Sequence, residues 1–374
     1  MGLTASDWLA RIHALPRSST VRILNVCGGH ERTLTTAGLR TALPPWVELI
    51  PGPGCPVCVC PEEDVYAAIR LALQERVVLV AFGDMLRVPV NVPKGEVRSL
   101  EQAKAAGADV RPIASPLEAV TIARAVPNQP VVFFAAGFET TTAPVAAMVA
   151  QGLPDNLHLL LSGRRTWPAV ALLLSVGTPG FQALVAPGHV ATVMGPEEWG
   201  FVVEKHHIPT AVAGFTPATL LAALYSVLRQ GLDGRLFLDN CYPDVVRPGG
   251  NLVARRLLAE TLEIIDAPWR GIGTIPASGY ALRSEHAAHD ARHVFSSVMD
   301  SAAQRGIGGM PPGCDCAEVV LGRRIPTACR LYGTACTPRT PVGPCMVSDE
   351  GACRIWWAGG TRGPDRVRQR QGDC

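Results

Sequence analysis

The sequence lacks the features of a membrane, secreted or nucleic-acid-binding protein. No apolar run reaches the roughly 18 residues that suggest a membrane-spanning helix. The N-terminal residues Met1–Trp8 show no basic stretch followed by an apolar core, so we expect no signal peptide. The formal net charge is only +2, which provides no general field for nucleic acid or anionic lipid. We therefore expect a cytoplasmic protein that contacts neither a membrane nor nucleic acid.

Cysteine, by contrast, is abundant, with 12 in a chain of 374 residues. In a reducing compartment such thiols are more often metal ligands or redox groups than structural disulfides. The early group comprises Cys27, Cys55, Cys58 and Cys60, and the late group comprises Cys314, Cys316, Cys329, Cys336, Cys345 and Cys353. Only Cys241 and Cys374 fall outside these groups. Because scattered core thiols would not cluster in this way, we expect two cysteine-based sites.

Short apolar runs alternate with amphipathic segments through the middle of the chain. This pattern is typical of an α/β fold in which helices cover both faces of parallel sheets. The predicted strands are Val21–Val26, Val77–Phe82, Val131–Ala136, Leu157–Leu161, Ala183–Ala186 and Thr210–Ala213. The predicted helices are Pro61–Leu73, Pro116–Val126, Thr141–Ala150, Thr216–Arg229 and Asn251–Ile265.

The order of these segments predicts two similar parallel-sheet α/β domains with a cleft between them. We place the first domain at residues 21–150 and the second at residues 151–268. Gly, Pro and Cys become frequent beyond that point, so residues 269–358 are expected to form a small cysteine-rich domain held by a metal centre. The Arg-rich residues 359–374 are expected to form a disordered tail.

The late cysteines Cys316, Cys329, Cys336 and Cys353 are spaced as ligands contributed by loops. Such spacing suits a [4Fe–4S] cluster, whereas structural zinc usually sits between two close Cys-x-x-Cys pairs, which this region lacks. The spacing favours an iron–sulfur cluster and leaves zinc open, because thiolate sites suit both metals. The surplus thiols, interpreted as ordinary buried cysteines, are Cys314 and Cys345, of which Cys345 is also a candidate reactive thiol.

Cys27 stands between a predicted strand and a predicted helix, in the segment Cys27-Gly28-Gly29-His30. A helix dipole stabilises a thiolate at its N-terminus, which favours a nucleophile or a metal ligand. The adjoining Gly28 and Gly29 would let a bulky group approach the backbone. His30 is either a second ligand or proton carrier, or a histidine satisfied within the core.

Two other strand or turn segments carry candidate groups. Cys55 and Cys58 form a Cys-x-x-Cys pair, which can cycle between disulfide and dithiol; half of a zinc site is the alternative. Glu139 follows a predicted strand, at the sheet edge where ligands gather. It is a candidate proton carrier, or only a carboxylate favoured by the helix dipole, and Thr140 and Thr141 would offer N–H donors.

Taken together, these segments resemble the HypD family of hydrogenase maturation factors. The matching stretches, in order along the chain, are Asn25–His30, Pro51–Cys58, Phe82–Pro89, Gly137–Thr141, Trp269–Gly271 and Ala335–Cys353. Each stretch alone is weak evidence, but all of them in order are highly specific. The resemblance implies a scaffold for assembly of the Fe(CN)2CO centre of [NiFe] hydrogenases.

The resemblance also implies cofactors and partners. It puts a [4Fe–4S] cluster on the four late cysteines, a transient iron carrying CN and CO ligands on Cys27, and a redox pair on Cys55 and Cys58. The implied partners are a small HypC-type chaperone that shares the iron, a cyanide-delivering HypE-type protein and, indirectly, the hydrogenase large-subunit precursor. A cluster domain built from both chain ends is implied as well, so residues 1–20 are expected to pack on it.

Two departures from the family pattern leave a specialised paralogue open. Glu31 and Arg32 follow His30, where the family usually has Thr and a second His, and Ser162–Pro168 differs from the family segment. The competing function is an iron–sulfur-dependent thiol–disulfide reductase. We expect an assembly scaffold with a redox role more than a turnover enzyme.

Overall fold

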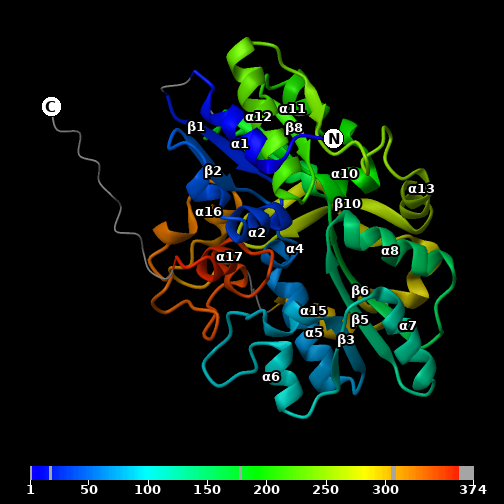
Figure 1. Cartoon of the computed structure of the whole chain (residues 1–374). Helices are drawn as coiled ribbons and strands as arrows, with labels where there is room; N and C mark the ends of the chain where they lie inside the picture. The colour runs from blue at the N-terminus through cyan, green and yellow to red at the C-terminus, as the bar shows by residue number, and fades with distance from the viewer. Residues whose placement is uncertain (1, 17–18, 177–178, 305–308, 362–374) are drawn as a thin grey trace.

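The computed structural model describes residues 2–16, 19–176, 179–304 and 309–361. Within these ranges the chain is α/β, with two sheets flanked by helices, as predicted (Figure 1). None of the helices in the described part of the chain is both long and apolar enough to span a membrane. The predicted tail lies outside the described residues from 362 onward, together with Cys374.

Sheet A contains five parallel strands in the order β2-β1-β7-β8-β9. These are β1 (Val21–Asn25), β2 (Val47–Pro51), β7 (Ala183–Pro187), β8 (Thr210–Ala213) and β9 (Leu238–Asn240). The chain first adds β2 on one side of β1 and later adds β7 on the other side. The strand order therefore reverses at β1, and the carboxyl ends of β1 and β7 flank the crevice in which α/β sheets bind ligands.

Sheet B contains six strands in the order β10-β11-β6-β5-β3-β4. These are β3 (Val78–Phe82), β4 (Val110–Ile113), β5 (Val131–Gly137), β6 (Leu157–Arg164), β10 (Leu262–Trp269) and β11 (Gly273–Leu282). The last two form an antiparallel hairpin on a parallel sheet. The predicted helix Asn251–Ile265 instead ends at Thr261, because the β-branched Ile264 and Ile265 pair with β11.

The two sheets are not built from consecutive halves of the chain. Sheet A takes its strands from residues 21–51 and 183–240, and sheet B from residues 78–164 and 262–282. β5 and β6, on either side of the expected boundary at residue 150, are paired neighbours in sheet B. That boundary does not separate the sheets, because parallel strands pair through crossovers and their order along the chain does not reveal their partners.

Helices cover both sheets, and several begin at side-chain caps. Thr4, Ser115 and Thr216 each start a helix with a capping box, and Asn251 caps another. The α-helices are α1 (Ala5–His13), α2 (Gly28–Thr36), α3 (Leu39–Ala42), α4 (Pro56–Val59), α5 (Glu62–Gln74), α6 (Leu100–Ala105), α7 (Pro116–Ala125), α8 (Glu139–Ala150), α9 (Thr166–Ser175), α10 (Gly188–Met194), α11 (Gly200–Glu204), α12 (Pro217–Asp233), α13 (Leu252–Thr261), α14 (Ala291–Val294), α15 (Ser296–Gln304), α16 (Cys316–Val320) and α17 (Ala352–Ala358). The 3-10 helices are η1 (Gly83–Arg87), η2 (Pro196–Trp199), η3 (Ser284–His289), η4 (Pro326–Ala328) and η5 (Pro344–Met346).

The N-terminal helix α1 packs on the helices of sheet A. The rings of Trp8 and of Tyr225 on α12 have centroids 5.4 Å apart. Ile12 is fully buried in the same hydrophobic cluster as strands of sheet A. Helix α1 of the expected N-terminal segment thus packs on α12 and on the core of sheet A.

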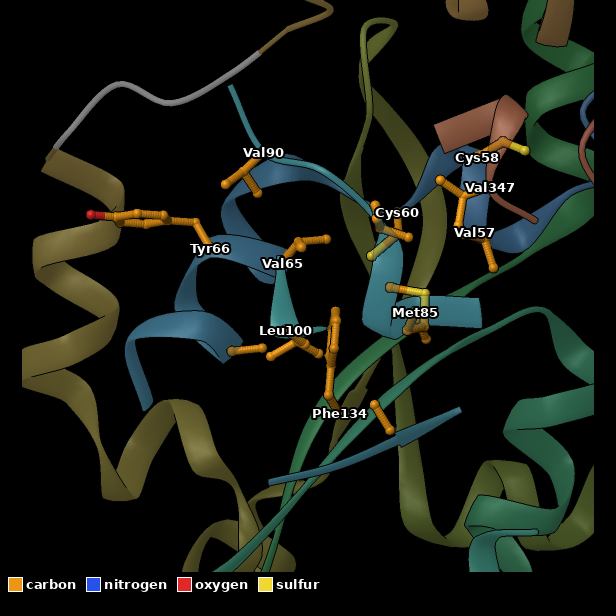
Figure 2. Packing of buried hydrophobic residues seen from close by; sticks show 14 of the residues in the cluster. Val57, Cys58, Cys60, Val65, Tyr66, Met85, Val90, Leu100, Phe134 and Val347 are labelled. Atoms are coloured by element: carbon orange, nitrogen blue, oxygen red, sulfur yellow. The ribbon is translucent and has the colours of Figure 1, made fainter. Parts of the chain in front are cut away.

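The late cysteines lie in a region of short helices and turns, η4, η5, α16 and α17, drawn orange to red in Figure 1. This region shares one hydrophobic cluster with α4, α5 and strands of sheet B. Figure 2 shows Val347 of this region in the same cluster as Cys58 of α4. The core of the cysteine-rich region is therefore continuous with that of the α/β framework.

Candidate functional site

Cys27 lies at the carboxyl end of β1, where the strand order of sheet A reverses, and is the N-cap of α2. Its side chain lines a small cavity with Cys55, Cys345 and Glu350. Cys55 comes from the Cys-x-x-Cys pair and Cys345 from the late group. The structure thus brings together one cysteine from each of three segments that are far apart in the sequence.

Close packing encloses this cavity, which has a volume of about 10 Å³, close to the minimum for one water molecule. A Cβ added at Gly28 would lie 2.5 Å from the Cβ of Glu350, and one at Gly29 would lie 2.7 Å from the ring of Phe215. A Cβ at Gly54 would lie 2.5 Å from the Cα of Cys27. These glycines are therefore needed for packing around Cys27, which itself remains partly exposed.

Burial controls the protonation of the Cys27 thiol. It raises the pKa of Cys27 to about 12, although the N–H groups of His30 and Gly29 point to the sulfur, and the carboxyl groups of Glu350 and Glu31 act in the same direction as burial. The expected stabilisation of a thiolate by the helix N-terminus is smaller than this desolvation cost. A metal that binds Cys27 therefore has to displace the thiol proton.

His30 is a buried histidine that contacts acceptors at both ring nitrogens. Its Nδ1 lies 3.0 Å from Oδ1 of Asn25, and its Nε2 lies 3.2 Å from the carbonyl oxygen of Ala213. Burial lowers the pKa of His30 to about 3. His30 is not among the residues that line the Cys27 cavity. The geometry therefore favours a core histidine that supports α2 over a second ligand.

Glu31 links the helix that follows Cys27 to the helix that carries Cys353. Its buried carboxylate pairs with Arg40 and accepts hydrogen bonds from Asn25 Nδ2 at 2.9 Å and from Trp356 Nε1 at 3.3 Å. The Arg40 guanidinium also lies over the Trp356 ring, 4.7 Å from its centroid. This departure from the family pattern thus ties α2 to α17. The sequence identified Glu31 as unusual but did not indicate its partners.

Cys55 and Cys58 are joined by a disulfide, and the N–H of Cys58 donates to the Cys55 sulfur at 3.1 Å. Of this pair, Cys55 lines the Cys27 cavity. Cys60 lies 3.4 Å from the Ser162 hydroxyl, and burial raises the pKa of Cys60 to about 12. The sulfurs of Cys58 and Cys60 point in different directions in Figure 2. Cys60 is therefore placed as a core thiol next to the pair.

The late cysteines converge, and the two surplus ones lie among them. Interaction with the thiols of Cys316 and Cys353 lowers the pKa of Cys345, and interaction with Cys316 and then Cys345 raises that of Cys353. The sulfur of Cys314 lies 3.4 Å from that of Cys316. No three His, Cys, Asp or Glu side chains in the described ranges are arranged to hold a single metal ion.

The donor set of this region nevertheless fits an iron–sulfur cluster. The ligands predicted from the sequence are all buried thiols carried by one stretch of short helices and turns. The Val342 N–H donates to the Cys336 sulfur at 3.4 Å, and the Gly343 N–H also favours its thiolate. Backbone N–H groups directed at cysteine sulfur are the outer-shell contacts by which proteins tune such clusters.

Glu139, Thr140 and Thr141 lie away from Cys27, at the carboxyl end of β5 in sheet B. The buried Glu139 carboxylate accepts hydrogen bonds from the N–H and the hydroxyl of Thr166, both at 2.7 Å. Burial raises the pKa of Glu139. None of Glu139, Thr140 and Thr141 lines the Cys27 cavity. The structure therefore does not bring these candidates to the cysteine site.

A buried ion pair that sequence reasoning missed joins the hairpin of sheet B to the Cys-x-x-Cys segment. Arg270 Nη2 donates to Oε1 of Glu62 at 3.0 Å and to the carbonyl of Pro89 at 2.7 Å. The backbone N–H of Arg270 donates to the carbonyl of Val59 at 3.0 Å. Both side chains of the pair are at most 1% exposed. The available signal in the sequence was Arg270 itself, because a charged residue next to a buried tryptophan needs a partner of opposite charge.

Comparison with known proteins gives a match over almost the whole chain. The HypD family, described as "Hydrogenase formation hypA family", matches residues 4–360. The hydrogenase maturation factor HypD of Rhizobium leguminosarum bv. viciae is 39% identical over 380 residues, covering 98% of this chain and 96% of the relative. The HypD of Rhodobacter capsulatus is 40% identical over 347 residues, 91% and 90% of the two chains. The HypD of Escherichia coli K12 is 37% identical over 341 residues, 90% and 88%.

Proposed function

This chain belongs to the HypD family of hydrogenase maturation factors, and from that premise we propose that it is a cytoplasmic scaffold on which the Fe(CN)2CO centre of [NiFe] hydrogenases is assembled. The observation that carries this proposal is the cavity shared by Cys27, Cys55 and Cys345. A candidate iron ligand, one cysteine of a disulfide and one late thiol line this cavity, which supports the proposal.

The iron that is being assembled is the substrate, and Cys27 is its protein ligand. A soft thiolate suits low-valent iron, and the Gly29 and His30 N–H groups that point to the Cys27 sulfur would stabilise the thiolate once the proton has left. A small HypC-type chaperone supplies a second cysteine to the same iron, and a HypE-type protein delivers cyanide. Cys27 is partly exposed as a residue, but its thiol is buried enough for its pKa to rise, so these partners have to displace the packing around it to reach the sulfur.

Cys316, Cys329, Cys336 and Cys353 would hold a [4Fe–4S] cluster, which supplies electrons when it is bound. The Val342 N–H donates a hydrogen bond to the Cys336 sulfur. Cys345 lies between these four cysteines, called the cysteine nest below, and Cys27. It interacts with Cys316 and Cys353 and also lines the Cys27 cavity. The Cys55–Cys58 disulfide, when it takes up two electrons and two protons, becomes a dithiol at the edge of the same cavity.

Infrared spectroscopy of this protein isolated with its small chaperone tests the iron site. The wild-type complex is expected to show cyanide and carbonyl bands. Cys27→Ser should lose these bands and leave the fold and the late cysteine region unchanged, because a hydroxyl keeps the shape but binds soft iron far less well. Full-strength bands and normal hydrogenase maturation in Cys27→Ser would exclude Cys27 as the ligand.

An iron–sulfur-dependent thiol–disulfide reductase is the second candidate, because a disulfide cysteine lines the cavity. Steady turnover of a disulfide substrate by the isolated protein would favour this function. Turnover by the isolated wild-type protein separates the candidates, because the scaffold hypothesis predicts none. Under the reductase hypothesis, a Cys58→Ala variant should lose the turnover that the wild type shows.

A further inference from the structure

A basic hollow opens on the surface next to the late cysteines. It has a volume of about 340 Å³, and its lining includes Arg87, Arg98, Glu101, Arg339, Thr340 and Val342. These residues come from two stretches that are far apart in the sequence. In Figure 1 the cyan segment around α6 lies beside the orange loops of the cysteine-rich region. Residues from both segments line the hollow.

The charges of this basic hollow are only partly balanced. Within the described ranges neither Arg98 nor Arg339 pairs with a carboxylate, and Arg339 is exposed. Arg87 reaches Glu101 at only 3.9 Å, and its Nη2 donates to the carbonyl of Pro338 at 2.7 Å. Three guanidinium groups thus face one carboxylate, and the hollow favours an acidic partner.

The hollow adjoins the outer side of the cysteine nest. Val342, which lines it, donates its N–H to the Cys336 sulfur at 3.4 Å. Cys336 is 7% exposed, whereas Cys345, on the side of the Cys27 cavity, is 1% exposed. The nest therefore has one side near the surface and one side near Cys27. For a reductant that binds in the hollow, the lining residue Val342 is all that separates it from Cys336.

We propose that the basic hollow is the docking surface for an acidic one-electron carrier protein of the ferredoxin or flavodoxin type. The docked carrier is oxidised by one electron and the cluster is reduced by one, with no bond formed or broken and no proton transferred. The inference rests on the proposed function, because it requires a cluster on the late cysteines. It adds the class of electron donor and the surface that receives it.

Charge reversal tests the docking surface. In the cluster-containing protein, Arg98→Glu combined with Arg339→Glu should weaken binding of an acidic [2Fe–2S] ferredoxin by about tenfold or more at low ionic strength. The rate of cluster reduction by reduced ferredoxin should fall by a similar factor. Arg87 is left unchanged because it contacts Glu101 and donates to the Pro338 carbonyl at 2.7 Å, whereas the guanidinium of Arg98 makes only a longer contact of 3.4 Å with the Val90 carbonyl. The matched control, Arg124→Glu with Arg235→Glu, makes the same charge change at two exposed residues outside the hollow.

Photoreduced deazaflavin, a small reductant that needs no docking, should reduce the cluster equally fast in all three proteins. Unchanged ferredoxin affinity and reduction rate in the Arg98→Glu, Arg339→Glu protein would overturn the docking proposal. So would an equal loss in the control, which would indicate a general effect of net charge. A wild-type protein that binds no cluster would overturn the proposed function instead, and calorimetric titration with ferredoxin would still report the charge dependence of docking.

Discussion

The early and late cysteine regions differ in what holds their thiols in place. Cys27 stands at a strand end and a helix start, and glycines pack the neighbouring segments against it. The late cysteines stand on short helices and turns, where thiols contact one another and share a core with the framework. The early site is therefore shaped by a strand end, a helix start and close glycine packing, whereas the late region combines interacting thiols with a core that it shares with the framework.

Removing a thiol from the late region should have the largest effect. We expect Cys353→Ala to lose the iron–sulfur cluster completely and to destabilise the region around it, because bound metal contributes directly to folding there. Visible absorbance, together with iron and sulfide content, measures the loss. A Cys353→Ala protein with its full complement of iron and sulfide would contradict the assignment of this ligand.

Cys314→Ala is the matched control for the late region, because the Cys314 sulfur lies only 3.4 Å from that of Cys316. We expect it to retain the cluster, while Cys316→Ala loses it. The opposite result would exchange these two residues in the ligand set and leave the other three in place.

Breaking the buried pair between Arg270 and Glu62 should come next. Arg270→Met leaves the Glu62 carboxylate buried without its counter-charge, and such losses cost about 3–5 kcal/mol. Denaturant unfolding gives the free energy difference. The double variant Arg270→Met, Glu62→Gln should be less destabilised than Arg270→Met alone. Equal stability of Arg270→Met and the wild type would show that this pair does not join the hairpin to the early cysteines.

Overpacking the early site should have a smaller cost. Gly28→Ala puts a methyl group 2.5 Å from Glu350, and insertions into packed sites cost about 1–3 kcal/mol. Gly83→Ala is the control, since a Cβ at Gly83 has no neighbour within 4 Å. Thermal unfolding of both variants measures the difference. Equal melting temperatures would mean that the Cys27 site is less tightly enclosed than the fold indicates.

The link between the two regions should show the smallest effect. Glu31→Gln keeps the shape of the side chain but removes the charge that pairs with Arg40, and we expect a loss of about 1–2 kcal/mol. Hydrogen exchange of the α17 amides should increase, because Glu31 accepts from Trp356. Protection of α17 at the wild-type level would show that packing alone holds the two regions together.

Local patterns in the sequence were enough to find the main elements. All six predicted strands are present, because continuous apolar runs bounded by glycine turns follow from local burial. Cys27 also lies where it was predicted, between a strand and a helix. The short strands β2, β4 and β9 and the hairpin β10–β11 were missed, since their burial depends on which strands lie beside them.

The sequence by itself determined the positions of six strands, the grouping of the cysteines and, through the order of its motifs, the family. Only the tertiary structure decided that Cys27, Cys55 and Cys345 share one cavity, that His30 is a buried core residue, and that Glu139 lies elsewhere. The physical reason is the distance along the chain over which each property is set. Helix and strand periodicity is encoded within a few residues, whereas the desolvation and the neighbours of a thiol or an imidazole depend on segments that parallel pairing brings together from distant parts of the chain.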